Sequence, residues 1–437
     1  MTMTMTMTAG YKSGAHWCLH RLATGWWLAM AALITLPKGA SAKILQVGPG
    51  HRWNSIAAAV RAAHPGDIIK VWPLPDHQAY RRAAVLVNKP RITIESAVPG
   101  RNVVIDGAGF NYSGRGPIPR AIFQFNSRAK GCTLRGFNLT GAHNRAGNGA
   151  GVRINAANHV SIVNCRIFGN DMGIMSNGSY LRHTAAFDLI DRCRIIKNGT
   201  SLHAGYNHNL YLGGTSVLIR RCDIADSLTG HNLKSRAHLT WIEYCFIHGS
   251  ANREIDLVDA RGTTDQPRSN AVVLGCIIIK KRHMSGNHEV VNFGSDGGAN
   301  HTGTLYFVHN TVITPYPTAA VVLSARGAHA VLIDNRLISM AHKATLLMFM
   351  NGASHTHVRG SGNRISKAYG AAARRYGGPL IAWKHITLPW PQLKRQPQPL
   401  MRLLPLEKIM PYRQPQAGAG PINWLDGDHH KPRSRGG

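Results

Sequence analysis

Ionisable side chains recur at matching places in three short segments between residues 208 and 260. The segments are HNLYLGG at 208–214, GHNLKSRA at 230–237 and NREIDLVDA at 252–260. They place the cations Lys234 and Arg236 one repeat away from the carboxylates Glu254 and Asp256. A positioned cation beside a carboxylate, or a pair of carboxylates, is what proton transfer and charge stabilisation require. This part of the chain is therefore the candidate site.

A second strand pattern with a conspicuous cysteine follows each segment. It is written apolar, any, apolar, any, any, Cys or Asn, any, apolar, and its Cys or Asn positions lie 23 to 34 residues apart. The slot is filled by Cys165, Cys193, Cys222, Cys245, Cys276, Asn310, Asn335 and Asn363. A repeat of about 20–50 residues made of short alternating segments predicts a solenoid of strands, with one parallel β-helix turn per repeat.

One such residue per turn predicts a column of side chains about 4.8 Å apart. An even number of cysteines in an exported chain is compatible with disulfides. Asparagine takes the same slot in later turns, however, so the slot needs a small side chain rather than a bridge. We therefore expect buried free thiols, which pack as small hydrophobic groups.

The N-terminal part of the chain indicates export. Arg21 precedes an apolar run of fifteen residues at 22–36, and Ala40-Ser41-Ala42 follows it. This is the pattern of a secretory signal peptide, and the run is short for a membrane-spanning helix. We expect a mature chain that starts near Lys43, is periplasmic or secreted, and has no membrane span after cleavage. An uncleaved anchor is the alternative.

Residues 53–64 have helical apolar spacing, with Asn54 or Ser55 as the N-cap and Pro65-Gly66 as the stop. A strand is expected at 67–72. A short helix before the first strand would cap the open end of the sheet. Prolines crowd the chain after residue 369, which predicts a basic extension without long elements.

The chain carries a formal net charge of +31. In an exported protein this charge argues against nucleic acid as a partner and favours an anionic polysaccharide or a lipid head-group surface. Basic charge that only maintains solubility is the alternative. We expect a monomer.

The opening IAAAVRAAHPGDIIKV at 56–71, followed by the repeats, resembles the exported right-handed parallel β-helix proteins of the pectate-lyase superfamily. The resemblance covers roughly residues 45–368. It implies an all-β, right-handed parallel β-helix with a short N-terminal capping helix. It also implies a function among polysaccharide lyases, glycoside hydrolases, uronate epimerases, pectin esterases and non-catalytic adhesins. The expected domains are a signal peptide at 1–42, the β-helix at 43–368 and the extension at 369–437.

Shorter motifs narrow this range of functions. Lys234-Ser235 looks like the first half of the lysine–arginine pair of the chondroitin and alginate lyases of this fold. The position one turn later is near Asp256, with Arg253 close by. The Asp-Asp pair of the galacturonan hydrolases and the Asp-Pro-His-Asp motif of the alginate epimerases are absent. The calcium-dependent members cluster acids that this chain mostly lacks, so we expect no metal and no cofactor, with a bound calcium as the alternative.

Aligning the strands that precede the cysteine strands predicts three columns. The first holds Asn209, Asn232, Glu254 and Glu289, the second holds Leu210, Leu233, Ile255 and Val290, and the third holds Tyr211, Lys234, Asp256 and Val291. The apolar column must face the core, so its neighbours are expected to face solvent. The predicted catalytic residues are Lys234, Arg236, Asp256, Glu254 and Glu289. The predicted substrate-binding residues are Asn209, Tyr211, His231, Asn232 and Arg253.

Three functions remain open for this exposed patch. In uronan cleavage by β-elimination, a cation neutralises the uronate carboxylate and a base takes the neighbouring proton; Lys234 beside Arg236 would be that base. A glycoside hydrolase would pair Glu254 or Asp256 with Glu289. A non-catalytic protein would only bind the polysaccharide, and a ladder of salt bridges without function is the structural alternative. We expect action on an acidic polysaccharide, with elimination as the preferred chemistry.

Overall fold

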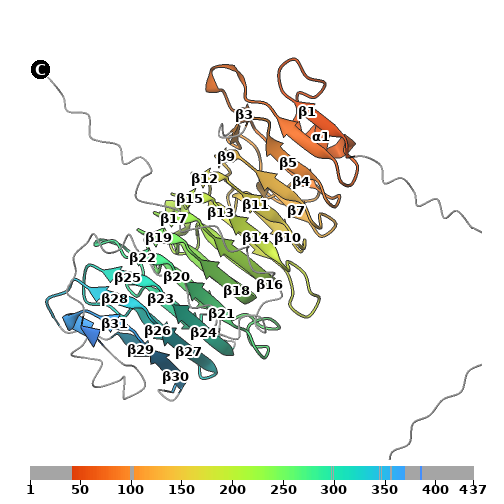
Figure 1. Ribbon diagram of the computed structural model, residues 1–437. Helices are drawn as coiled ribbons and strands as arrows, with labels where there is room; N and C mark the ends of the chain where they lie inside the picture. Colours follow the sequence, from red (N-terminus) through yellow and green to blue (C-terminus); the bar gives the residue numbers. More distant parts are fainter. Residues whose placement is uncertain are drawn as a thin grey trace, which may run out of the picture. The chain divides into compact units, whose positions relative to one another are not determined.

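Two sheets of parallel strands form the body of the molecule in the computed structural model. It describes residues 42–369, apart from 99–102, 297, 299, 344, 346, 355 and 356, together with 384 and 385. One sheet has twenty strands and the other has twelve. Each strand pairs with its counterpart from the next turn of the chain (Figure 1). This arrangement is the parallel β-helix that the repeat predicts.

The larger sheet forms two of the three faces of each turn. The first face contains β4 (Val85–Val87), β7 (Ala121–Asn126), β10 (Ala150–Asn155), β13 (Met172–Asn177), β20 (Ile255–Val258), β23 (Val291–Gly294), β26 (Val321–Leu323) and β29 (Met348–Met350). The second face contains β1 (Ile44–Val47), β2 (Ile68–Val71), β5 (Thr93–Ser96), β8 (Thr133–Arg135), β11 (Ser161–Val163), β14 (Asp188–Asp191), β21 (Ala271–Leu274), β24 (Gly303–Val308), β27 (Ala328–Ile333) and β30 (Val358–Ser361). The long strands β16 (Leu210–Arg220) and β18 (Leu233–Glu243) run through both faces.

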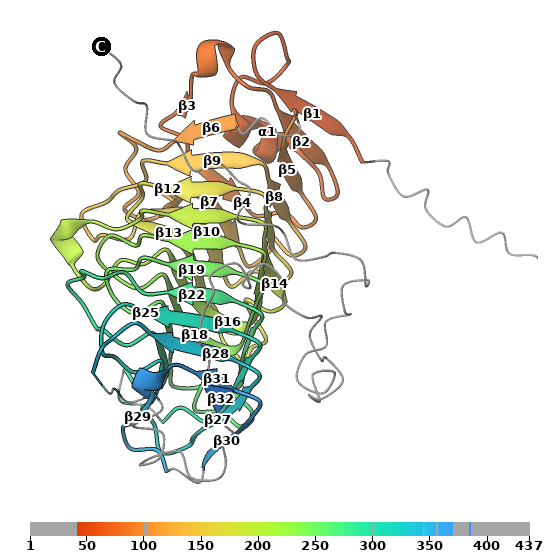
Figure 2. The same cartoon turned by 60° about the vertical axis from the view of Figure 1, so that its left-hand side comes forward.

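The smaller sheet is the third face, and Figure 2 shows its strands stacked one above another. It contains β3 (Tyr80–Arg81), β6 (Val103–Asp106), β9 (Phe137–Thr140), β12 (Arg166–Phe168), β15 (Arg194–Ile196), β17 (Asp223–Ala225), β19 (Phe246–His248), β22 (Ile277–Ile279), β25 (Thr311–Thr314), β28 (Arg336–Ser339), β31 (Arg364–Ile365) and β32 (Lys384–His385). Alternate apolar residues from all three faces point inward and form one continuous core.

The predicted column of cysteines and asparagines is confirmed. The backbone N–H of Cys165 points to Sγ of Cys193, and the same contact repeats through Cys222 and Cys245 to Cys276. The Cys276 N–H then donates to Oδ1 of Asn310 at 2.9 Å, and the asparagines continue the pattern. Six cysteines are free and buried, as predicted. The slot therefore selects a small group that accepts a backbone hydrogen bond.

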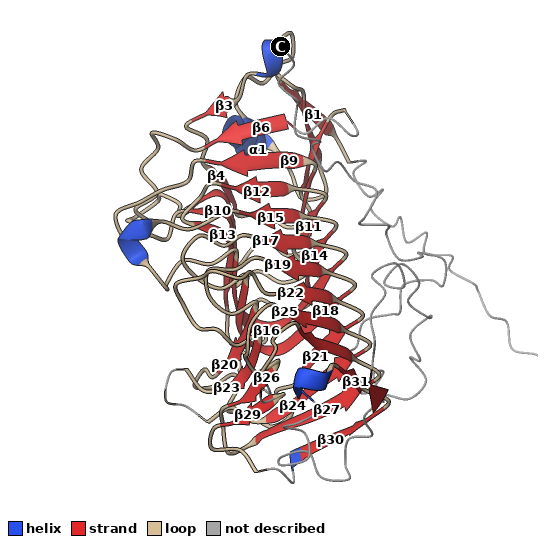
Figure 3. Ribbon diagram, turned by 90° about the vertical axis from the view of Figure 1, so that its left-hand side faces the viewer, coloured by secondary structure: helices blue, strands red, loops and turns tan. Residues whose placement is uncertain are grey.

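A short helix covers the N-terminal end of the core, as expected. Helix α1 (Ile56–Ala62) contacts β1, β2 and β4 (Figure 3). The Ser55 side chain caps it by accepting from the N–H of Ala58 at 3.4 Å. The helix buries Ile56, Ala59 and Val60 against the open end of the core. Two 3-10 turns lie at Pro75–His77 and Ser201–His203, and residues 367–369 are also helical.

The predicted signal peptide lies outside the described residues, and so does the C-terminal extension apart from β32. Its cleavage and the domain boundaries therefore stay predictions. Within the described ranges, no helix is long and apolar enough to cross a membrane.

Candidate functional site

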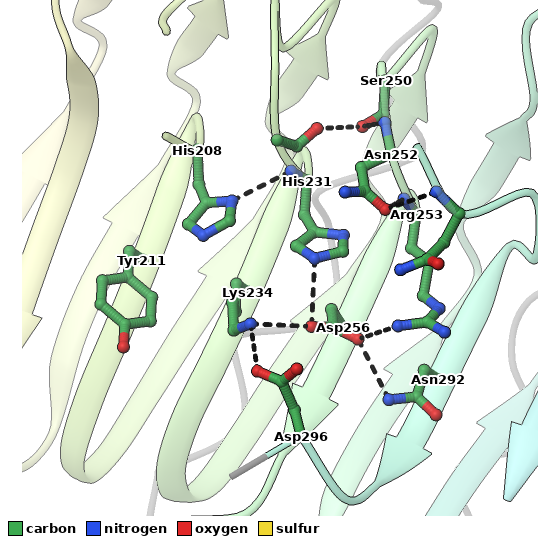
Figure 4. A network of polar contacts seen from close by, with 12 residues as sticks. His208, Tyr211, His231, Lys234, Ser250, Asn252, Arg253, Asp256, Asn292 and Asp296 are labelled. Atoms are coloured by element: carbon green, nitrogen blue, oxygen red, sulfur yellow. Dashed lines mark hydrogen bonds and ion pairs between the residues drawn. The ribbon is translucent and has the colours of Figure 1, made fainter. Parts of the chain in front are cut away.

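A row of outward side chains on the first face brings the predicted pair together. Strand pairing places Lys234 opposite Asp256, with Tyr211 beside Lys234 on one side and Asn292 beside Asp256 on the other. Figure 4 shows these side chains on the same side of the sheet. The Lys234 Nζ lies 3.3 Å from Oδ2 of Asp256. The predicted adjacency of Tyr211, Lys234 and Asp256 is therefore confirmed, whereas their predicted exposure is wrong for Lys234 and Asp256, because loop residues and neighbouring side chains bury both.

Asp256 is the centre of a charge network. Its Oδ1 contacts NH1 of Arg253 at 3.2 Å and accepts from the Asn292 amide at 3.1 Å. Its Oδ2 lies 3.2 Å from Nε2 of His231, in addition to the Lys234 contact. The side chain is fully buried. Burial alone would raise the pKa of Asp256, but His231, Lys234 and Arg253 outweigh it and hold the pKa well below the usual range.

Two stacked histidines flank the network at the start of β16 and β18. The His208 and His231 rings lie 5.1 Å apart between centroids. The backbone N–H of His231 donates to Nδ1 of His208 at 3.0 Å. Burial lowers the pKa of His208 well below normal and that of His231 to about 4, even though Asp256 pulls the latter upward. Both imidazoles are therefore neutral near pH 7, and His231 directs its Nε2 toward Asp256.

A carboxylate from a loop completes the network. Asp296, after β23, contacts Nζ of Lys234 at 2.5 Å and accepts from NH2 of Arg236 at 2.8 Å. Arg236 also donates through Nε to Oη of Tyr211 at 3.2 Å and through NH1 to the backbone carbonyl of Asp259. The Asp296 side chain is 37% exposed, against 10% for Lys234. Asp296 is thus an accessible acid that contacts the mostly covered Lys234.

Sequence reasoning missed Asp259 and Asp296. Each follows its strand end by one or two residues, since β20 ends at Val258 and β23 ends at Gly294. The N–H of Asp296 donates to Oδ1 of Asp259 at 2.6 Å, which fixes one loop against the other. Both acids come just after the ends of neighbouring parallel strands, which meet at one edge of the sheet. Their matching positions could have predicted that Asp259 and Asp296 lie close together.

The predicted exposure of Asn209, Asn232 and Glu254 is wrong. All three are fully buried and continue an internal ladder that begins at Asn170 and Asn198. The Asn198 and Asn209 amides each donate to the next asparagine at 2.8 Å, and Asn232 donates to Oε2 of Glu254 at 2.6 Å. These residues precede Leu210, Leu233 and Ile255, where the strands begin, so they lie in the turn. Strand alternation does not apply there.

The ladder ends on a buried ion pair. Nζ of Lys280 lies 3.7 Å from Oε1 of Glu254 and donates to the backbone carbonyl of Asn252. Burial raises the pKa of Glu254 against the pull of Lys280, and burial lowers the pKa of Lys280 to about 8. Sequence reasoning assigned Lys280 no role. Glu254 is buried and bound to Asn232 and Lys280. Its predicted role as an exposed catalytic acid is therefore not supported.

The predicted column for Glu289 and Val291 is wrong by one residue. Ile255 pairs with Val291 and Asp256 with Asn292, which leaves Glu289 before the strand. The Glu289 side chain is half-buried, and its Oε2 lies 3.3 Å from Nε of Arg253. The carboxylate pairs expected for hydrolysis, Glu254 or Asp256 with Glu289, are therefore not brought together as one exposed pair.

The cations of the site all have acidic partners. Lys234 contacts Asp256 and Asp296, Arg236 contacts Asp259 and Asp296, and Arg253 contacts Asp256 and Glu289. Within the described part of the chain, no group of three or more His, Cys, Asp or Glu side chains is arranged to hold a metal ion. The arrangement offers ion-paired cations, two partly exposed carboxylates in Asp296 and Glu289, and the phenol of Tyr211.

Comparison with known proteins finds only distant structural likenesses. No family model and no curated protein matches the sequence. The chain is similar to a tailspike mutant of E. coli bacteriophage HK620 in complex with pentasaccharide, at 10% identity and TM-score 0.49, covering 75% of this chain and 61% of that one. It is also similar to pectate lyase Pel9A, at 14% identity and TM-score 0.41, covering 74% and 80%. The chain thus spans about three fifths of the tailspike chain.

Proposed function

We propose that this chain cleaves an acidic polysaccharide by β-elimination on the outward side of β16, β18 and β20. One observation carries the proposal: the Asp296 carboxylate is held between Nζ of Lys234 and NH2 of Arg236. A uronate carboxylate has the same charge and planar shape, so these cations would bind it in the same way once Asp296 moves aside. A row of side chains along stacked strands also suits a polymer.

Each group then has a role in the elimination. Lys234 and Arg236 neutralise the uronate carboxylate, which makes the proton on the adjacent carbon easier to remove. The displaced Asp296 carboxylate takes that proton as the general base. The electron pair forms a carbon–carbon double bond while the bond to the glycosidic oxygen breaks. Lys234 is thus assigned to charge neutralisation rather than to the base role expected from the sequence, because two carboxylates already bind its ammonium group.

Tyr211 supplies the proton for the leaving oxygen. Its Oη accepts a hydrogen bond from Nε of Arg236, so the phenol keeps its own proton for another acceptor. Tyr211 lies directly beside Lys234 on the neighbouring strand. The backbones of Lys234 and Tyr211 are one strand step of about 4.8 Å apart, and the Arg236 guanidinium lies 3.2 Å from the phenol.

The test follows unsaturated product by its ultraviolet absorbance during incubation with a panel of uronans. Tyr211→Phe and Asp296→Asn should each slow turnover by about 10²–10⁴-fold. Asp296→Asn should bind the polymer at least as tightly as the wild type, because the variant removes the competing carboxylate. Asp334→Asn, in the turn after β27, is the matched control and should be unchanged.

Two results would overturn the proposal. One is a wild-type protein that forms no unsaturated product from any uronan. The other is an Asp296→Asn variant that turns over as fast as the wild type. A protein that retards the polyanion in a gel but releases no product is a binding protein, and new reducing ends without absorbance indicate hydrolysis.

A further inference from the structure

A guanidinium without an acidic partner lies on the same outward row as the candidate site. Strand pairing runs Gln124, Arg153, Met175, Tyr211 and Lys234 along the first face. Arg153 donates to Sδ of Met175 at 3.5 Å and to Oδ1 of Asn177 at 3.4 Å. Among the described residues, no carboxylate lies within ion-pair distance of it. It differs in this respect from Lys234, Arg236 and Arg253, each of which has an acid.

The surroundings of Arg153 make this lack of a partner costly. The side chain is half-buried, and Arg120 is close enough for its charge, together with burial, to lower the pKa of Arg153. Arg120 donates to the backbone carbonyl of Ser113 and likewise has no acid in the described ranges. Two partly desolvated cations side by side are unfavourable unless an anion neutralises them. An anionic ligand would supply the acidic partner that Arg153 lacks.

A second row beside Arg153 offers the hydrogen bonds that sugar hydroxyls need. Asn88, Asn126, Asn155 and Asn177 point outward on β10, β13 and the ends of β4 and β7 and bond side chain to side chain at 2.8 to 3.3 Å. Carboxamides both donate and accept. On the other side of the site the row continues from Asp256 through Asn292 to the apolar Val322. The row thus has an apolar residue beyond each end, Leu86 beside Gln124 and Val322 beside Asn292, and the asparagines flank it only on β4 to β13.

We infer that Arg153 is a second anion-binding residue, which binds a carboxylate or sulfate group of the same polysaccharide chain whose uronate unit sits at Lys234. The chain would run from Lys234 over Tyr211 and Met175 toward β10. Three strand steps of about 4.8 Å separate the two cations by about 14 Å. Arg153 thereby selects polymers that carry a negative charge at both positions. This inference rests on the proposed function for the Lys234 end.

The role of Arg153 can be tested by calorimetric titration with oligogalacturonates and alginate oligosaccharides of increasing length. The full-length protein carries Asp296→Asn in these titrations, so that the oligomers are not cleaved. Arg153→Gln should weaken binding of the long oligomers by about tenfold or more, since an ion-assisted hydrogen bond is lost. It should leave a disaccharide, too short to reach Arg153, unchanged. Arg153→Lys should restore part of the loss. Arg166→Gln, an exposed arginine on β12 of the third face, is the control.

The outcomes separate the two proposals. Equal affinity of Arg153→Gln and Arg166→Gln for long oligomers overturns the second site and leaves cleavage at Lys234 standing. A wild type that binds no polyanion refutes both. Repeating the titration with chondroitin sulfate oligosaccharides identifies the anion: a larger Arg153 effect than with the uronans assigns a sulfate, and an equal or smaller one assigns a carboxylate.

Discussion

Acidification from pH 7 to pH 5 should remove the stability that depends on several buried histidines staying neutral, while the raised pKa values of His143 and Asp188 act in the opposite direction. His231 and His301 are both buried, and burial lowers the pKa of each to about 4. In the unfolded chain an imidazole has a pKa of about 6.5. Between about pH 4 and pH 6.5, each imidazole is therefore protonated in the unfolded chain and neutral in the folded protein. Stability is therefore complete above about pH 6.5 and is lost as the pH falls toward 4.

The size of the loss follows from the two pKa values. At pH 5 each histidine lowers the free energy of unfolding by about 2 kcal/mol, so the pair lowers it by about 4 kcal/mol. His208, whose pKa is also lowered by burial, acts in the same direction. The depressed pKa of Asp256 contributes nothing in this window, since a carboxylate of that kind loses its contribution only below about pH 4. A domain's total stability is about 5–15 kcal/mol, so the effect is large.

The dependence of the free energy of unfolding on pH can be measured by urea unfolding at pH 7.5, 6 and 5. Circular dichroism follows the unfolding, and the ionic strength is kept fixed. His301→Asn isolates one contribution, because His301 packs against Phe293, away from the Asp256 network. The variant should lose about 2 kcal/mol of the difference between pH 7.5 and pH 5. The reasoning fails if the stability difference between pH 7.5 and pH 5 is the same in His301→Asn as in the wild type.

Three further predictions concern the buried polar groups, and urea unfolding checks all of them. Asn209→Ala should cost about 2–6 kcal/mol, because it removes one buried hydrogen-bond partner each from the Asn198 N–H, the Asn198 side chain and the Asn232 side chain; a loss under about 1 kcal/mol would contradict the ladder. Lys234→Ala should cost about 3–5 kcal/mol, since it leaves Asp256 buried beside fewer cations; a stability equal to the wild type would show that solvent reaches the pair. Cys222→Asn should be tolerated better than Cys222→Leu, which overpacks the column by about 1–3 kcal/mol; the reverse order would show that the slot does not need an acceptor.

The fold could be predicted because its signal is repeated many times. The slot shared by Cys222 and Asn310 recurs at nearly constant spacing, and one inward position per turn is enough to define the stack. The register at β23 could not be predicted in the same way. Val290 and Val291 are both apolar, so alternation does not show which of them pairs with Ile255.

The site could be predicted only where strand geometry decides it. Lys234 and Asp256 lie within strands, and their adjacency follows from the repeat. Asn232 and Glu254 lie just before strands, where a turn directs the side chain inward. Asp296 belongs to a loop, and no sequence pattern shows which loop folds over which strand. Its contact with Lys234 is therefore visible only in three dimensions.

The repeated contact between a backbone N–H and the next cysteine or asparagine makes neighbouring turns interchangeable. Each turn from Cys165 to Asn363 presents a Cys or Asn acceptor to the turn before it and a backbone N–H donor to the turn after it. Removing or duplicating one whole period joins surfaces that already match, whereas a partial period shifts every later inward residue. Lineages carrying this architecture can thus change length in whole-turn steps by recombination, and the length of the outward strand faces changes with it.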